Sequence, residues 1–392
     1  MIRHRRGRSP QVRTTHNRPG FAMFMALGAL VIIAVLIAAS SFVTLQESRL
    51  GQNSLVNSRA FTAAEYGLNK IQQDWDKTPN LNMANGASFD TNYTIAGQGT
   101  CKVRYTRLND ATFWIVSEGR AAAGNSTAAS RTSVKRVGAI LRLRIPTIRA
   151  NGAVTVNGDI NVQGSPQVNG GNTLPAGWAG CDATKPGLAG IVAPPGSSVS
   201  IQNASQVTGI PQVLRDALVA DSNTYVRYGD ETWNTLVAMA NITLTNGNPP
   251  DALPTLNPDG TCNKTDQTNW GEPFRSAGYV AACINYFPII YSTQSLALNG
   301  GRGQGILLVD GDVRLNGNLD WFGLIIARDD ITKGNGNATI TGAIMARNAQ
   351  ISDNSAVLGN ITINYSQCSL EHALRGSAQV TQAKERAWTE IY

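Results

Sequence analysis

The sequence predicts an α+β protein that combines a long N-terminal membrane helix, a small antiparallel sheet and a parallel β-helix, or β-solenoid, with a large insertion. Three observations lead to this fold class. A run of 25 uncharged residues follows a basic N-terminal segment, a proline-free amphipathic stretch continues from that run, and glycines later recur every six and about every 18 residues. These patterns are typical of a membrane span, a long helix and a solenoid, respectively.

The chain begins with a basic segment and a membrane span. Residues 1–20 contain six arginines and no acidic residue, and residues 21–45 contain no charge. At about 1.5 Å per residue such a run crosses a ~30 Å hydrocarbon core as a helix, which satisfies its own backbone in lipid. The arginines predict a single-pass helix in the inner membrane, with a cytoplasmic N-terminus and everything after Leu45 on the other side.

Helical periodicity continues beyond the membrane. Apolar residues recur at helical spacing from Leu45 to Ile71, and the first proline after the apolar run is Pro79. We therefore expect one helix over residues 21–78, roughly 55 residues and on the order of 80 Å long. Its second half is amphipathic, so this half needs a packing partner outside the membrane.

Two motifs in this helix resemble those of type IV pilins. The basic arm that ends at Gly20, just before Phe21, resembles the processing site of a type IV prepilin. The segment from Arg59 to Leu68, RAFTAAEYGL, is similar to the one that follows the membrane helix of PilX-type minor pilins. The resemblance covers about residues 18–72. It implies a pilin-like helix, cleavage after Gly20 by a prepilin peptidase, methylation at Phe21, and other pilins and minor pilins as partners.

One position departs from the major pilins. Their fifth mature residue is a glutamate that pairs with the N-terminal amine of a neighbouring subunit, whereas the corresponding residue here is Met25. Some minor and tip-located subunits share this departure. The resemblance therefore favours a minor subunit that acts in assembly or adhesion, first in the inner membrane and then in or at the tip of a pilus on the cell surface.

Residues 79–145 are expected to form a small antiparallel head on the upper half of the helix. Alternating or continuous apolar residues indicate strands near residues 91–95, 101–105, 112–117 and 133–144, separated by turns rich in Gly, Asn and Ser. A sheet of this size would cover the amphipathic face of the helix.

A glycine repeat follows the head. Gly152, Gly158, Gly164 and Gly170 are six residues apart, and the segments GILLV, GLIIA, GAIMA and GNITI begin at residues 305, 323, 342 and 359. Short strands at this period indicate a β-solenoid over residues 146–172 and 296–368, with a β-sandwich as the alternative.

The two solenoid segments are separated by a stretch without the repeat. Residues 173–295 are expected to form an insertion with short helices near 210–220 and 231–240, which caps one edge of the solenoid or presents a surface. The tail, residues 369–392, has helical character and is expected to cap the last coil.

The cysteines indicate disulfides and give no zinc signal. Five cysteines occur without CxxC spacing, and outside the cytoplasm they allow at most two disulfides. Cys181, Cys262 and Cys283 are the disulfide candidates, because they share one loop-rich region. Closing the loop between residues 262 and 283 would stabilise the fold by roughly 3 kcal/mol on the chain-entropy model.

Charge and the turn residues limit the function further. The net charge of +7 comes from the leader, without which basic residues exceed acidic ones by only one, so no nucleic-acid partner is expected.

Aspartates in the solenoid turns allow a polysaccharide-active enzyme as an alternative, but such residues more often cap turns. Four tryptophans could form a sugar-binding patch or pack in the core. The residues concerned are Asp310, Asp312, Asp320, Asp329, Asp330, Asp353, Trp178, Trp233, Trp270 and Trp321.

The sequence thus predicts a minor pilin-like structural subunit of a type IV pilus system, with no enzymatic activity, no cofactor and no metal. A surface or polysaccharide target is a candidate further partner. The alternatives are a type II secretion pseudopilin, a membrane-anchored β-helix enzyme acting on polysaccharide, and a scaffold with a plain membrane anchor.

Overall fold

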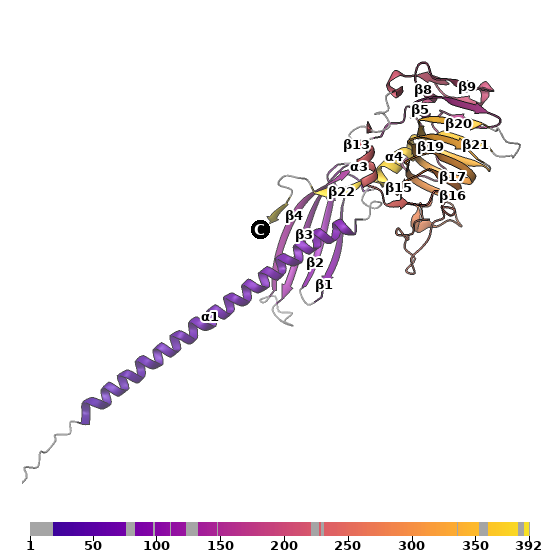
Figure 1. Cartoon of the computed structure of the whole chain (residues 1–392). Coiled ribbons are helices and arrows are strands. Elements are labelled where there is room, and N and C mark those ends of the chain that lie inside the picture. Colours follow the sequence, from indigo (N-terminus) through magenta and orange to yellow (C-terminus); the bar gives the residue numbers. More distant parts are fainter. Residues whose placement is uncertain are drawn as a thin grey trace, which may run out of the picture.

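The computed structural model shows a long helix, a head and a solenoid in a row (Figure 1). The head sheet lies against the upper half of helix α1, and the solenoid lies beyond the head, away from the free half of that helix. Most of the leader, residues 1–18, lies outside the described residues. The structure describes residues 19–75, 83–96, 99–109, 111–122, 132–146, 148–220, 227–228, 231–334, 336–352, 360–382 and 388–391.

Helix α1 runs without interruption from Pro19 to Gln73, which is 55 residues. It ends about five residues before the predicted position 78, because the chain turns into the head at this point. The backbone N–H of Asp74 still donates to the Lys70 carbonyl at 2.9 Å, but Trp75 packs on Phe113 with ring centroids 5.0 Å apart. The described part of the helix thus ends next to a buried aromatic side chain that anchors the chain to the head.

The head is an antiparallel sheet of order β1-β2-β3-β4-β22, with β23 also paired to β4. One face packs on α1 around Ala64, Leu68 and Ile71. The strands are β1 Ser88–Ile95, β2 Gly99–Arg107, β3 Thr112–Ala122, β4 Thr132–Arg144, β22 Gln379–Gln382 and β23 Trp388–Ile391.

The C-terminal tail completes this head, which corrects the expectation that residues 369–392 only cap the solenoid. β22 pairs with the end of β4, with Gln379 opposite Arg144, and β23 pairs further along, with Trp388 opposite Ala139. β4 is 13 residues long, and its outer edge would expose unpaired backbone groups without these strands.

The solenoid consists of parallel strands in three stacks, which confirms the predicted β-solenoid. The first stack contains β14 Ile242–Leu244, β15 Ile289–Ser292, the ends of β16 Leu296–Val309, β17 Val313–Ala327 and β19 Ala338–Ala346, then β5 Gly152–Val156, β8 Ala189–Ala193 and β11 Val213–Arg215. The second contains the starts of β16 and β17, then β18 Asp330–Lys333, β20 Asn348–Ser352, β6 Ile160–Gln163 and β9 Val199–Ile201. The third contains the middles of β16 and β17, the start of β19, then β21 Ile361–Tyr365, β7 Gln167–Asn169 and β10 Val207–Thr208.

The long glycine period has a steric cause. Gly305, Gly323 and Gly342 stand opposite one another in β16, β17 and β19, and all three have positive φ, between 116° and 155°. A Cβ on Gly323 or Gly342 would also overlap the carbonyl oxygen of the glycine in the coil before it. Each coil therefore bends at the same place, and only glycine fits there.

The two solenoid segments join in an order that the sequence does not suggest. The first coil, β5 to β7, stacks on the last one, β19 to β21, and β8 to β11 continue the stack outward. The chain then crosses to the opposite end and resumes at β14. The expected insertion, residues 173–295, is therefore partly solenoid, because these short strands extend both ends of the stack.

The connecting segments contain little helix. The expected helix at 231–240 is α3, Trp233–Ala238, whereas the region 210–220 holds β11 and a 3₁₀ turn. Helix α4, Gln367–Gly376, packs on β16, β17 and β19 and leads into β22. The other short elements are η2 Ala204–Gln206, η3 Ala217–Ala220, η5 Ala281–Cys283, β12 Arg227–Tyr228 and β13 Glu231–Thr232.

Candidate functional site

The lower half of α1 is the main candidate site, because it is apolar and has no partner in the described chain. Its large apolar side chains from Phe21 to Leu45 are between 52% and 80% exposed. Within the described residues, α1 supplies the one helix that is long and apolar enough to cross a membrane. It is a candidate membrane anchor.

Two hydroxyl groups inside this apolar run form hydrogen bonds within the helix. The Ser40 hydroxyl donates to the Ile37 carbonyl at 3.0 Å, and the Thr44 hydroxyl donates to the Ser40 carbonyl at 2.9 Å. Such back-bonding hides hydroxyls from lipid. The hydroxyls of Ser40 and Thr44 thus fit a membrane helix.

The predicted processing site lies at the start of α1. Gly20 and Phe21 are in its first turn, and the Phe21 side chain is 74% exposed. Met25, one turn further, is also exposed, and the run from Phe21 to Leu45 has no acidic side chain. A new N-terminus at Phe21 would begin the mature chain directly with the exposed helix.

Between the membrane span and the head, α1 stays exposed for about ten more residues. Leu50 is 67% exposed, and Leu55 is similarly accessible. From Val56 onward the helix carries a buried face. The free part of α1 is therefore longer than a membrane span requires.

The upper half of α1 is held to the head through small residues. Ala60, Ala63 and Ala64 are fully buried. A Cβ added to Gly119 of β3 would overlap the Ala60 carbonyl oxygen and the Ala64 nitrogen, and one added to Gly67 would lie 2.9 Å from Val103 Cγ2. The RAFTAAEYGL segment thus owes its small residues to a close helix–sheet contact.

The solenoid aspartates are engaged in turns. Asp312 Oδ1 accepts the backbone N–H of Asp330 at 3.0 Å, and Asp330 Oδ1 accepts the Asn348 amide at 2.7 Å. Asn348 Oδ1 in turn accepts the N–H of Asp159 at 2.9 Å, and Asp159 Oδ1 accepts that of Ser198 at 2.7 Å. These four hydrogen bonds form a ladder that joins five successive coils, so these side chains stabilise turns.

The other acidic candidates lie apart from this ladder. Asp310 pairs with Arg328 at 2.8 Å, and Asp329 lies 3.8 Å from Arg347. Burial raises the pKa of Asp320, which the nearby Arg302 partly offsets. Asp353 lies outside the described residues.

The four tryptophans do not form a surface patch. Trp178, Trp233, Trp270 and Trp321 are all buried. Trp270 and Trp321 meet edge to face inside the solenoid, whereas Trp178 packs with Phe287 and Phe322 under α4. They are core residues, which removes them as a sugar-binding platform.

The structure pairs four of the five cysteines. Cys262 is bonded to Cys283, and Cys181 is bonded to Cys368, a residue that the sequence did not single out. The missed pair joins the loop after β7 to the first turn of α4. Cys101 stays a buried thiol, and burial raises its pKa.

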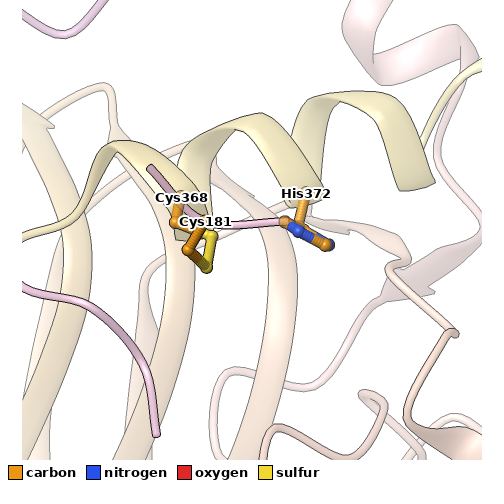
Figure 2. A group of neighbouring side chains, drawn as sticks. All are labelled: Cys181, Cys368 and His372. Atoms are coloured by element: carbon orange, nitrogen blue, oxygen red, sulfur yellow. A yellow bond between two sulfur atoms is a disulfide. The ribbon is translucent and has the colours of Figure 1, made fainter. Parts of the chain in front are cut away.

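Cys181, Cys368 and His372 form a group with the appearance of a metal site (Figure 2). Figure 2 shows the two sulfur atoms bonded to each other and the imidazole one turn further along α4. A cysteine binds a metal ion as its thiolate, and cysteines joined in a disulfide do not supply thiolates. In this form the group offers one ligand atom, the His372 imidazole, whose Nε2 lies 3.2 Å from the Ala179 carbonyl oxygen.

Comparisons with known proteins show no family and only weak structural similarity. No family model matches the chain, and no curated protein matches it. Among solved structures, the chain is similar to the crystal structure of the competence-associated pilin ComZ from Thermus thermophilus. The identity is 13%, the match covers 86% of this chain and 97% of that chain, and the TM-score is 0.26. At that score no residue role is transferred from that pilin to this chain.

Proposed function

We propose that this protein is a minor pilin-like structural subunit of a type IV filament system. A prepilin peptidase cuts it after Gly20, and α1 holds it in the inner membrane until it joins other pilins and minor pilins. The division of α1 carries this proposal. Its lower half exposes an apolar surface, and its upper half is fixed to the head by buried small residues. The same free surface can face lipid first and neighbouring helices later.

The proposed orientation places the head and solenoid outside the cytoplasm. The six leader arginines favour a cytoplasmic N-terminus. Two disulfides in the solenoid region fit an oxidising compartment. Both observations support the same single-pass topology.

The shape of the molecule supports a position at or near the filament tip. The solenoid lies beyond the head and opposite the free half of α1 (Figure 1). A module in that place would obstruct subunits stacked above it in a uniform shaft. Met25, in place of the acid that major pilins carry, supports the same proposal. The role there is to prime assembly or to adhere to a surface.

The proposed role is structural and not catalytic. Asp310 and Asp312, which an anchored polysaccharide-active enzyme would need, are bonded to Arg328 and to a backbone N–H of the next coil. We therefore expect replacement of these aspartates to affect the stability of the turns. We expect no polysaccharide turnover even in the unsubstituted chain, so the replacements would abolish no activity.

Replacing Gly20 tests the proposed processing. We expect Gly20→Val to leave residues 1–20 attached and to keep the chain out of sheared surface filaments. Gly28→Val is the matched control, because a Cβ at Gly28 meets nothing within 4 Å. Equal processing of both variants would contradict the proposed prepilin cleavage after Gly20. Normal processing without recovery in surface filaments would favour a type II secretion pseudopilin.

A further inference from the structure

The disulfides of this chain are nested in the sequence. Cys262 pairs with Cys283 at a separation of 21 residues, whereas Cys181 pairs with Cys368 across 187 residues and encloses the first pair. Cys101 precedes all four and keeps a buried thiol. Both members of the long-range pair therefore have nearer cysteines than their native partner.

We propose that this protein depends on a thiol–disulfide isomerase as a folding partner. The long-range pair forms last and competes with nearer thiols, so wrong pairs must be exchanged. This inference rests on the proposed placement of the head and solenoid outside the cytoplasm, where cysteines are oxidised.

Cys101, Cys262 and Cys283 all lie nearer to Cys181 in the sequence than Cys368 does. Cys101 and Cys262 each lie about 80 residues from Cys181, and the probability of closing a flexible loop falls with about the three-halves power of loop length. In an unfolded chain each wrong loop thus forms about 3.5 times as readily as the native loop of 187 residues. At about 5–20 residues per second, synthesis delivers Cys368 roughly 10 to 40 s after Cys181.

The backbone contacts that hold the Cys181 loop beside Cys368 come from a late segment, whereas Trp178 of the same loop packs on Phe287 and Phe322, which precede Cys368. β7, which precedes Cys181, pairs with β21, which precedes Cys368. The Thr173 N–H donates to the Tyr365 carbonyl at 2.8 Å, and Asn172 Oδ1 accepts the Gln367 N–H at 3.0 Å. The loop that carries Cys181 gains these contacts only when the end of the solenoid is available.

The head that contains Cys101 lacks two of its strands until the end of the chain. β4 receives β22 and β23 from residues 379–391, beyond Cys368. Cys101 itself lies on β2 between β1 and β3 and against α1, which all precede Cys181. Its thiol therefore reacts when this incomplete head opens. A Cys101–Cys181 disulfide would tie the head to the loop after β7 and block the docking of α4.

Correction of this wrong pair is an exchange without net oxidation. An isomerase thiolate attacks Cys181 Sγ, and Cys101 leaves as a thiolate that takes up a proton. The Cys368 thiolate, formed by loss of a proton, then attacks Cys181 Sγ in the mixed disulfide and releases the isomerase thiolate. One disulfide is broken and one is formed, so the isomerase is regenerated.

The test expresses the full chain in two matched bacterial hosts, one with and one without a periplasmic thiol–disulfide isomerase. Free thiols are trapped by alkylation, and disulfides are mapped by mass spectrometry. We expect the Cys181–Cys368 fraction to fall at least threefold without the isomerase, with Cys101–Cys181 in its place. The Cys262–Cys283 pair is the internal control and should form in both hosts. Equal Cys181–Cys368 fractions would overturn the inference.

A variant without competitors tests the cause. Cys101→Ala/Cys262→Ala/Cys283→Ala leaves Cys181 and Cys368 alone, and this pair should form equally in both hosts. Continued dependence on the isomerase would show that mispairing is not the reason. Reduced Cys262 and Cys283 in both hosts would overturn this inference and the proposed location together. If the native pairing requires the isomerase but the chain is absent from filaments, this result would contradict only the proposed function.

Discussion

Gly67 sets how closely α1 approaches the head. Its missing side chain leaves room for Ser117, Val103 and Cys101, and a Cβ there would lie 3.0 Å from Cys101 Sγ. The same helix contains Gly51, where a Cβ would meet nothing within 4 Å. Substitution of Gly51 therefore tests helix propensity alone, whereas substitution of Gly67 also tests the packing of α1 on the head.

Replacing each glycine by alanine should change stability in opposite directions. Gly51→Ala should stabilise the chain by up to about 1 kcal/mol, because alanine favours helix. Gly67→Ala should destabilise it by about 1–3 kcal/mol, because the head must move away from α1. Denaturant unfolding of the full chain in detergent measures both. Stabilisation by Gly67→Ala would contradict the close contact.

His372 makes stability depend on pH. Burial lowers the pKa of His372, the Ala179 carbonyl raises it, Arg275 and Arg375 lower it, and Glu371 raises it. With the net pKa below 6.5 in the folded chain, the unfolded chain binds more protons in the window just below 6.5. Stability should therefore fall as pH decreases through that window. His372→Gln should lose this part of the pH dependence in thermal unfolding, and an unchanged profile would contradict the assignment.

Among the elements, the turns between solenoid coils are joined by side chains as well as by strands. Asn348 bonds to Asp330 of one coil and to the Asp159 N–H of the next. It stands at the junction where the last coil meets the first coil of the chain. Loss of this side chain should loosen that junction specifically.

Asn348→Ala should cost about 1–2 kcal/mol, since it removes two hydrogen bonds and leaves a backbone N–H without its acceptor. Asp329→Ala is the matched control in a neighbouring turn and should change stability by less than about 0.5 kcal/mol, because its ion pair with Arg347 is exposed. Hydrogen exchange should show loss of protection in β20 and β6 for Asn348→Ala alone. Equal effects of the two substitutions would contradict the ladder.

At the scale of the whole molecule, the solenoid is an insertion between two adjacent strands of the head. The chain leaves the head after β4 and returns through α4 to β22, which pairs beside the end of β4. The chain enters the solenoid at β5 of the first coil and leaves it after β21 of the last coil, and these two coils stack on each other. The two modules also have separate cores of described residues.

The head should therefore fold without the solenoid. Joining Arg144 to Gln379 by a short Gly-rich turn should preserve α1 and the sheet, because these residues are already opposite each other. The control is truncation after Ser377, which keeps the solenoid but exposes the edge of β4 and should destabilise the head. Hydrogen exchange in β1 to β4 measures both. An unfolded head in the joined chain would contradict this modularity.

Local patterns predicted much of this molecule, and long-range pairings were missed. The uncharged run and its amphipathic continuation predicted α1, and the glycines at 305, 323 and 342 predicted the coils, because each signal recurs at short separation along the chain. The return of β22 and β23, the stacking of the first coil on the last and the Cys181–Cys368 bond join residues far apart, which no local pattern encodes. Strands of three residues such as β9, β11 and β14 are too short to show periodicity.

The central claim is that a cut, exposed α1 places this protein in a filament. Intact-mass and N-terminal peptide analysis of the protein from native membranes and sheared surface filaments tests it most directly. We expect a mature chain that starts at methylated Phe21 in the filament fraction. An uncut chain that retains Met1 and the leader arginines, found only in membranes, would contradict it.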